Sequence, residues 1–137
     1  MRTRHPRVDG RPWEHAVFDA RPEAIADARR IADAFMNSLT PAVDDLTASS
    51  VALVVSELVT NVVRHAQGTS CSLRLWARPG AITVAVTDAD PRPPRERDPD
   101  LTGGTGGFGW PMVQNLARSV TVKTGPGGKT IRAELPR

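Results

Sequence analysis

The sequence predicts an α+β protein: a two-layer sandwich whose mixed, mostly antiparallel sheet is covered on one face by three helices. Apolar residues at helical spacing in 22–39 and 44–67 predict two of the helices. Alternating segments at 71–77 and 82–86 flank the turn sequence "RPGA" and predict a hairpin with one buried face. A second hairpin around "GPGG" closes the chain, so the expected order is β-α-α-β-β-loop-α-β-β.

The two long helices carry recognisable boundary signals. Pro22 stands in the first turn of the first helix, where its missing N–H costs nothing. The second helix is expected to begin near Asp44 and to end at Gly68, a residue type that commonly terminates helices. Its apolar stripe consists of Val51, Val54, Val55, Leu58 and Val62.

The segments between these elements are less regular. Residues 1–12 contain four arginines and predict a disordered basic tail ahead of one domain at 13–137. The short apolar segment "HAVFDA" favours an edge strand at 15–20. Residues 91–107 hold four prolines and four glycines without periodicity, which is typical of a functional loop. A short helix is expected at Trp110–Arg118.

Composition narrows the class of protein. The 137 residues suffice for one domain with one core. The net charge is +3, but only Lys123 and Lys129 are lysines, an arginine bias that indicates a GC-rich genome. No basic patch is interleaved with aromatic residues, which argues against direct nucleic-acid binding. A single cysteine, Cys71, excludes an internal disulfide. Without a long apolar run or signal-peptide pattern, we expect a cytoplasmic protein with no membrane contact.

A polar strip borders the apolar stripe of the second helix, in "SELVTNVVRHA". With Leu58 at the centre of the stripe, a helical wheel places Asn61, Glu57 and Arg64 on one side, about 60°, 100° and 120° away. A cleft between helices and sheet would open along such a border. A solvated helix flank would show the same pattern, so this helix alone leaves both interpretations open.

Asp88 continues a row of inward-facing apolar residues. Ile82, Val84 and Val86 alternate on the buried face of "AITVAVTDAD", and Asp88 is next on that face. A carboxylate in this position needs hydrogen-bond donors. It would either accept from loop amides or present an acceptor to a ligand, for which the exocyclic amine of adenine is suited.

Glycines 104, 106, 107 and 109 precede the last helix, where backbone amides and the helix dipole can hold phosphate. "GTGGFG" has the GxGxxG spacing, but it follows a proline-rich loop instead of a strand, which excludes the dinucleotide-binding motif. "GPGGKT" lacks the first glycine of a P-loop and leads into the final strand, which excludes that motif too.

These features occur in one order along the chain: Glu57 and Asn61 on a helix, Asp88 at a strand end, a long loop, "GFG" opening a helix, and "GKT" in the last hairpin. Together they resemble the GHKL (Bergerat-fold) ATPases, the superfamily of gyrase, the histidine kinases and MutL, over residues 14–136. "SELVTNVVRHA" and "GGFGWPMVQNLA" are most similar to the small anti-sigma factor serine/threonine kinases of bacteria.

The resemblance implies a role for each residue. Asn61 would coordinate Mg²⁺ beside the phosphates of ATP, and Glu57 would orient or deprotonate the nucleophile. Asp88 would accept from the adenine amine, and residues 91–107 would form the ATP lid. The other expected nucleotide contacts are Gly107, Gly109, Thr130 and Arg64.

The chain also departs from the family pattern. Asp88-Ala-Asp90 replaces the family's Asp-x-Gly, and Phe108 and Trp110 stand where many relatives have arginine and leucine. Strand alternation puts Ile131, Ala133 and Leu135 on one face and Thr130 on the other. Thr130 would therefore reach the site only if the start of the last strand is bulged or twisted.

The resemblance implies a kinase that transfers the γ-phosphate of ATP to a serine of an anti-anti-sigma (STAS-type) protein and otherwise binds a sigma factor. Phe108, Trp110 and Asp90 favour the alternative of a non-catalytic or degenerate ATP-binding module that acts through protein contact. A sensor-kinase fragment is a third interpretation, which would need another chain. Close relatives are commonly dimers, so a homodimer is a further possibility.

Overall fold

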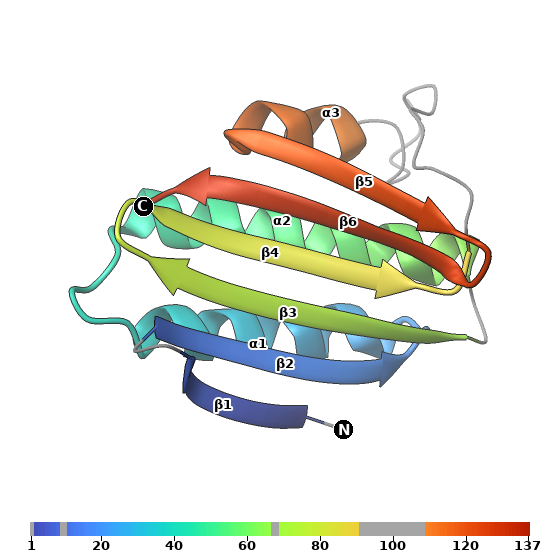
Figure 1. Ribbon diagram of the computed structural model, residues 1–137, viewed down its shortest axis with the longest axis horizontal. Helices are drawn as coiled ribbons and strands as arrows, with labels where there is room; N and C mark the ends of the chain where they lie inside the picture. The colour runs from blue at the N-terminus through green and yellow to red at the C-terminus, as the bar shows by residue number, and fades with distance from the viewer. Residues whose placement is uncertain (1, 9–10, 67–68, 91–108) are drawn as a thin grey trace.

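The computed structural model describes residues 2–8, 11–66, 69–90 and 109–137. Its strands are β1 (Arg2–Val8), β2 (Arg11–Asp19), β3 (Ser70–Arg78), β4 (Ala81–Asp88), β5 (Ser119–Gly125) and β6 (Gly128–Pro136), and its helices are α1 (Glu23–Asn37), α2 (Asp45–His65) and α3 (Gly109–Leu116). The strands form one sheet in the order β1-β2-β3-β4-β6-β5 (Figure 1).

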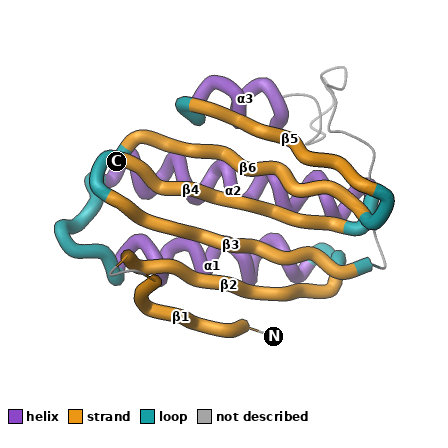
Figure 2. The backbone as a smooth tube through the Cα atoms, viewed as in Figure 1, coloured by secondary structure: helices purple, strands orange, loops and turns teal. Residues whose placement is uncertain are grey.

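The protein is the expected two-layer α+β sandwich. The helices lie on one face of the sheet, with α1 and α2 side by side behind it and α3 near β5 (Figure 2). Each neighbouring pair of described strands is antiparallel, so the sheet is not mixed. Since no connection here requires a parallel crossover, hairpins supply most of the pairing.

The N-terminal segment corrects the prediction of a disordered tail at 1–12. Residues 2–8 form β1, which pairs antiparallel with β2, and the register shifts between His5 and Val8. The segment predicted as an edge strand at 15–20 therefore belongs to β2, which has a neighbour on each side. The arginine-rich sequence with a proline resembles a tail because these residue types have low strand propensity and show no apolar alternation.

Helix α2 is the central element of the helical layer. The Asp44 side chain caps its N-terminus by accepting from the Thr47 N–H at 2.7 Å. The predicted stripe is buried, and Val59 and Val63 are buried with it. By length and composition alone α2 could cross a membrane. Here its valines pack between α1, α3 and the sheet, which is the position of a core helix.

The inner face of the sheet carries the core. Strand β3 alternates between buried and partly exposed residues, as predicted, while β4 is buried on both faces. Its outer residues Thr83 and Ala85 are covered although no described helix lies on that side. The Trp76 ring lies beneath the guanidiniums of Arg74 and Arg132, which stand 5.2 Å and 5.5 Å from its centroid. This layer shields the outer face of β4.

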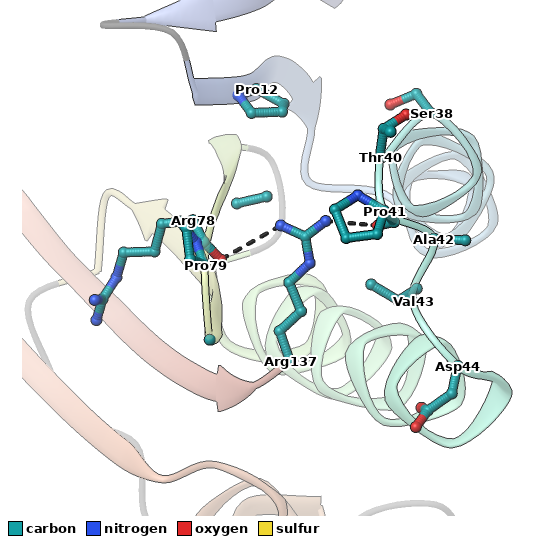
Figure 3. Close-up of a pocket in the computed structure, with 12 residues that line it drawn as sticks. Pro12, Ser38, Thr40, Pro41, Ala42, Val43, Asp44, Arg78, Pro79 and Arg137 are labelled. Atoms are coloured by element: carbon teal, nitrogen blue, oxygen red, sulfur yellow. Dashed lines mark hydrogen bonds between the residues drawn. The ribbon is translucent and has the colours of Figure 1, made fainter.

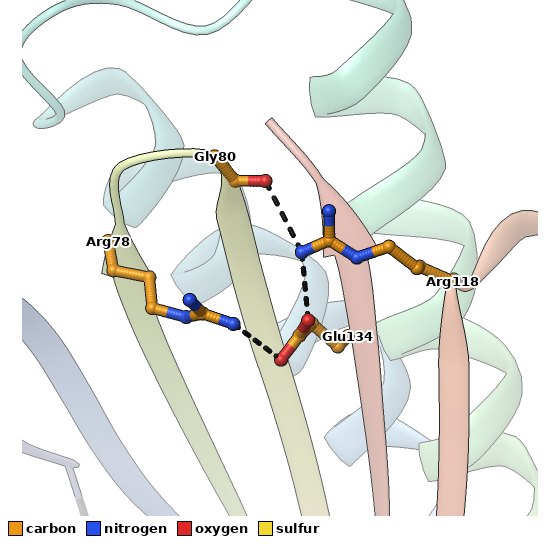
Figure 4. Close-up of polar contacts among 4 residues, drawn as sticks. All are labelled: Arg78, Gly80, Arg118 and Glu134. Carbon is orange, nitrogen blue, oxygen red and sulfur yellow. Dashed lines mark hydrogen bonds and ion pairs between the residues drawn. The ribbon is translucent and has the colours of Figure 1, made fainter.

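Polar contacts connect the strands at the end of the sheet where β3 turns into β4 (Figure 4). Glu134 on β6 accepts from Arg118 at 2.8 Å and from Arg78 at 2.9 Å. These two guanidiniums, first that of Arg118, lower the pKa of the Glu134 carboxyl. The contacts link β3 and β6 to Arg118, the residue just before β5.

Candidate functional site

The predicted polar strip of α2 lies partly inside the molecule. Glu57 and Asn61 are half-buried, and Arg64 is exposed at the next turn. Burial raises the pKa of the Glu57 carboxyl, and the positive charge of Arg64 opposes that rise. Within the described residues the Asn61 amide makes no hydrogen bond, so its oxygen is available to a ligand. Glu57 and Asn61 thus lie between the core and the solvent-exposed surface of α2.

The Glu57 carboxylate lies against the first residue of α3. A Cβ built on Gly109 would overlap Oε2 of Glu57 and lie 3.2 Å from its Cδ. Only glycine leaves this space, and an anion at a helix N-terminus is favoured by the helix dipole. Helix α3 therefore helps to position the carboxylate, through the glycine that the sequence singled out.

Asp88 lies at the end of β4, on the inner face as predicted. Its side chain is 1% exposed, and its Oδ2 is 2.9 Å from Nζ of Lys129, whose side chain is 2% exposed. Oδ1 accepts from the backbone N–H of Asp90 at 2.6 Å. Lys129 also donates to the Asp90 carbonyl at 3.1 Å. The contact with a loop amide that the sequence left open is present, and Lys129 adds a charged partner that the sequence analysis did not name.

The start of β6 approaches the end of β4 very closely. Gly128 has φ of 144°, and a Cβ there would overlap the Asp88 carbonyl oxygen and come within 3.0 Å of Ala89 Cα. Glycine is required here on both grounds. This close approach places Lys129, the next residue, directly opposite Asp88.

Thr130 does not join the site. The register pairs Asp88 with Lys129 and Thr87 with Thr130 without a bulge, so Thr130 points to the outer face. Its hydroxyl lies 2.8 Å from that of Thr87. The expected contact with a phosphate or with Asp88 is thus corrected. Strand alternation already carried the signal for Lys129, since it shares a face with Ile131 and Leu135.

Cys71 is the neighbour of Asp88 on β3. Burial, with a smaller contribution from the Asp88 charge, raises the pKa of the Cys71 thiol to about 12. The thiol therefore stays protonated and packs as a small apolar group, as its sequence context predicted.

The site elements gather at one end of the sheet. The C-terminal end of α2, the end of β4 and the start of β6 lie together there (Figure 1). Gly107 and the predicted lid at 91–107 lie outside the described residues. No cluster of three His, Cys, Asp or Glu that could hold a metal occurs in the described parts of the chain. A Mg²⁺ ion at Asn61 would be completed by oxygens of water and of a nucleotide.

The two ends of the expected nucleotide site differ in their fit. At the phosphate end, the Asn61 amide makes no hydrogen bond with the described residues, the Glu57 carboxylate lies against Gly109, and Arg64 adds positive charge. These groups suit Mg²⁺ and phosphate. At the base end, Oδ1 of Asp88 accepts from the Asp90 amide, and the buried Oδ2 faces Nζ of Lys129 at 2.9 Å without making a hydrogen bond. With the ion pair closed, an adenine amine would have to share Oδ2 with the Lys129 ammonium.

A pocket of about 640 Å³ lies at the far end of the sheet, between the α1–α2 loop and the β3–β4 turn (Figure 3). The Arg137 guanidinium reaches into it and donates to the carbonyls of Pro41 at 2.7 Å and Arg78 at 3.4 Å. Asp44 on its rim caps α2. These polar groups hold the fold together, and none of the predicted site residues lines the pocket.

Comparison with protein families matches residues 18–135 to the histidine kinase-like ATPase domain. Among solved structures, the RsbU and RsbW domains of Rv1364c from Mycobacterium tuberculosis share the fold, with a TM-score of 0.66 and 21% identity over 92% of this chain. A histidine kinase domain from Erythrobacter litoralis EL346, of a blue-light activated histidine kinase, gives a TM-score of 0.48 and 27% identity over 66% of this chain and 44% of that one. No curated protein matches.

This chain spans about a third of the Mycobacterium tuberculosis chain, 33% of its length. The family match, in contrast, covers nearly all of the domain, from the end of β2 to the end of β6. It includes the α2 segment with Glu57 and Asn61, the end of β4 and the start of α3. The resemblance inferred from those motifs is thereby confirmed, and the chain belongs to the family of histidine kinase-like ATPase domains, within the GHKL superfamily.

Proposed function

We propose that this domain is an anti-sigma factor kinase that binds ATP and transfers its γ-phosphate to a serine of a protein partner. The observation that carries the proposal is the placement of Glu57. Its carboxylate is half-buried against Gly109, its pKa is raised by burial, and the free Asn61 amide lies one turn further along α2. A nucleotide-binding relic would not need a carboxylate held in this way.

Glu57 is the proton acceptor in the proposed reaction. The serine oxygen attacks the γ-phosphorus, an O–P bond forms, and the bond between that phosphorus and the oxygen of departing ADP breaks. The serine proton passes to Glu57, whose raised pKa makes it a stronger base than an ordinary glutamate. The neutral Asn61 amide would hold Mg²⁺, which would offset negative charge on the ATP phosphates, and Arg64 on the next turn of α2 would add positive charge.

The proposed partners are an anti-anti-sigma protein with a STAS-type domain, as phosphate acceptor, and a sigma factor. Support comes from the similarity of "SELVTNVVRHA" and "GGFGWPMVQNLA" to the anti-sigma kinase branch, together with membership of the ATPase family. In the same proposal residues 91–107 act as the ATP lid and the protein works in the cytoplasm. A homodimer is proposed as well, and light scattering measures whether the protein is a monomer or a dimer.

Transfer of radiolabelled phosphate from ATP to the STAS-type partner tests the kinase activity. Glu57→Gln keeps the size of the side chain and removes the base, so transfer should fall by about 10²–10⁴-fold. Glu23→Gln, on an exposed position of α1, is the matched control and should be as active as wild type. No transfer by wild type, or undiminished transfer by Glu57→Gln, would contradict the proposal.

The closed Asp88–Lys129 pair favours a second candidate, a non-catalytic module that acts through protein contact. That module would bind its partner equally well with glutamate or glutamine at position 57. Calorimetry with Mg-ATP, combined with phosphate release over hours, separates the candidates. Nucleotide binding without turnover supports the second, and turnover that depends on Glu57 supports the first.

A further inference from the structure

Asp88 and Lys129 form a deeply buried ion pair. The two residues face each other across β4 and β6 on the inner side of the sheet. Their side chains are 1% and 2% exposed, and Oδ2 lies 2.9 Å from Nζ. Removing one partner of a buried pair leaves an uncompensated charge, so such a pair stays closed unless another group replaces the lost contact.

Both oxygens of Asp88 have a contact within the protein, one a hydrogen bond and the other an ion pair. Oδ1 of Asp88 accepts from the Asp90 amide at 2.6 Å, and Oδ2 has no hydrogen-bonding partner beyond the Lys129 ion pair. The ammonium group also donates to the Asp90 carbonyl at 3.1 Å. Lys129 therefore fixes both the carboxylate and the backbone that follows it, at the point where β4 leaves the sheet.

The backbone keeps Lys129 in this position. Gly128 allows β6 to approach the Asp88 carbonyl more closely than any residue with a Cβ could. The regular register then sets Lys129 opposite Asp88, while Thr130 turns to the outer face. Because Lys129 lies on a paired strand, its backbone position is fixed more firmly than that of a lysine on a loop.

We propose that Lys129 determines the base specificity of the nucleotide site by withholding the Asp88 carboxylate from an exocyclic amine. This inference rests on the proposed ATP binding. With the pair closed, the protein holds a nucleoside triphosphate through its phosphate end, and the 6-amino group of adenine adds little. With a small neutral residue in place of Lys129, the carboxylate is free to accept from that amine, and adenine is preferred.

Calorimetry with three Mg-bound nucleotides tests the proposal: ATP, GTP and purine riboside triphosphate, which lacks the 6-amino group. Wild type should bind ATP and purine riboside triphosphate within about threefold of each other, because no acceptor contacts the amine. Lys129→Thr should bind ATP at least about tenfold more tightly than purine riboside triphosphate. A preference for ATP above about tenfold in wild type would overturn the inference.

Lys123→Thr is the matched control. It makes the same change of residue and charge on exposed β5, one strand away, and should reproduce the wild-type affinities. A Lys129→Thr protein that folds and shows the wild-type ratio also overturns the inference. If that variant does not fold, the wild-type ratio alone decides. If wild type binds no triphosphate at all, both the proposed ATP binding and the inference fail. If wild type binds ATP with a strong preference for adenine, only the inference fails.

Discussion

Gly109 determines where the Glu57 carboxylate can lie. In Gly109→Ala the new methyl would overlap Oε2, the end of a flexible side chain, so the carboxylate moves while the fold remains. We expect phosphate transfer to fall by about 10²-fold, because small displacements of a reacting group have effects of that size. Steady-state transfer rates and thermal melting, measured together, check this.

Gly127→Ala serves as the control for that experiment, since a Cβ on Gly127 meets nothing within 4 Å. It should leave both the transfer rate and the melting temperature unchanged. Full activity in Gly109→Ala would show that the position of the Glu57 carboxylate does not limit the reaction.

The pKa of Glu57 gives the activity a defined pH dependence. Burial raises this pKa and the charge of Arg64 lowers it. Because the proposed base acts as the carboxylate, kcat/KM should decline as the pH falls through a pKa above the ordinary glutamate value. Stability runs the other way: a carboxyl with a raised folded-state pKa loses its stabilising contribution as pH rises through that pKa.

Arg64→Ala should move the acidic limb of the kcat/KM profile to higher pH, since the opposing charge is gone. Arg29→Ala removes an equal charge from exposed α1 and should leave the limb in place. An acidic limb at the same pH in both variants would mean that another group titrates.

At the scale of elements, the approach of β6 to β4 depends on a single glycine. Gly128→Ala places a methyl on the Asp88 carbonyl and requires a φ of 144° that alanine rarely adopts. Unlike the overlap at Gly109, this one involves backbone on both sides and cannot relax easily. We expect a loss of about 2–5 kcal/mol in the free energy of unfolding, measured with denaturant.

Gly125→Ala, at the end of β5 with open space around it, should change that free energy by less than about 1 kcal/mol. Equal stability of the two variants would mean that the strand ends separate without cost. In that case the register that sets Lys129 opposite Asp88 would not be fixed by the backbone.

Elements with a strong internal period could be predicted from the sequence. The α2 stripe and the alternation in β3 each report burial directly, because every residue of the pattern faces the same neighbouring layer. Strand β1 could not be predicted, since it is short and arginine-rich and has no apolar alternation to signal its pairing with β2. Glu57 was identified by its place on the helix, while its contact with Gly109 depends on how α3 packs.

At the scale of the whole molecule, β1 covers the edge of β2, which the sequence predicted to be an edge strand. Deleting residues 1–10 would expose the unpaired backbone of β2 to solvent and to other molecules. We expect the melting temperature to fall by roughly 3–10 °C and self-association to increase with concentration. Calorimetry and light scattering measure the two effects.

An unchanged melting temperature in the deleted chain would show that β1 contributes nothing to stability, as the prediction of a tail implied. The site itself was only partly predictable at this scale. Resemblance directed attention to Thr130, which strand alternation puts on the outer face, whereas the structure places Lys129 on the inner face. The alternation within β6 is a local pattern and correctly put Thr130 on the outer face. The pairing of Lys129 with Asp88, in contrast, depends on two strands from distant parts of the chain.

One row of side chains crosses the inner face beside the site, and it consists of Phe18, Cys71, Asp88 and Lys129. The only thiol of the protein therefore adjoins the buried ion pair. A thiol with a pKa of about 12 reacts slowly with alkylating reagents. Any motion that separates β4 from its neighbours would admit water and reagent together. The rate of Cys71 labelling therefore measures how often this end of the sheet opens.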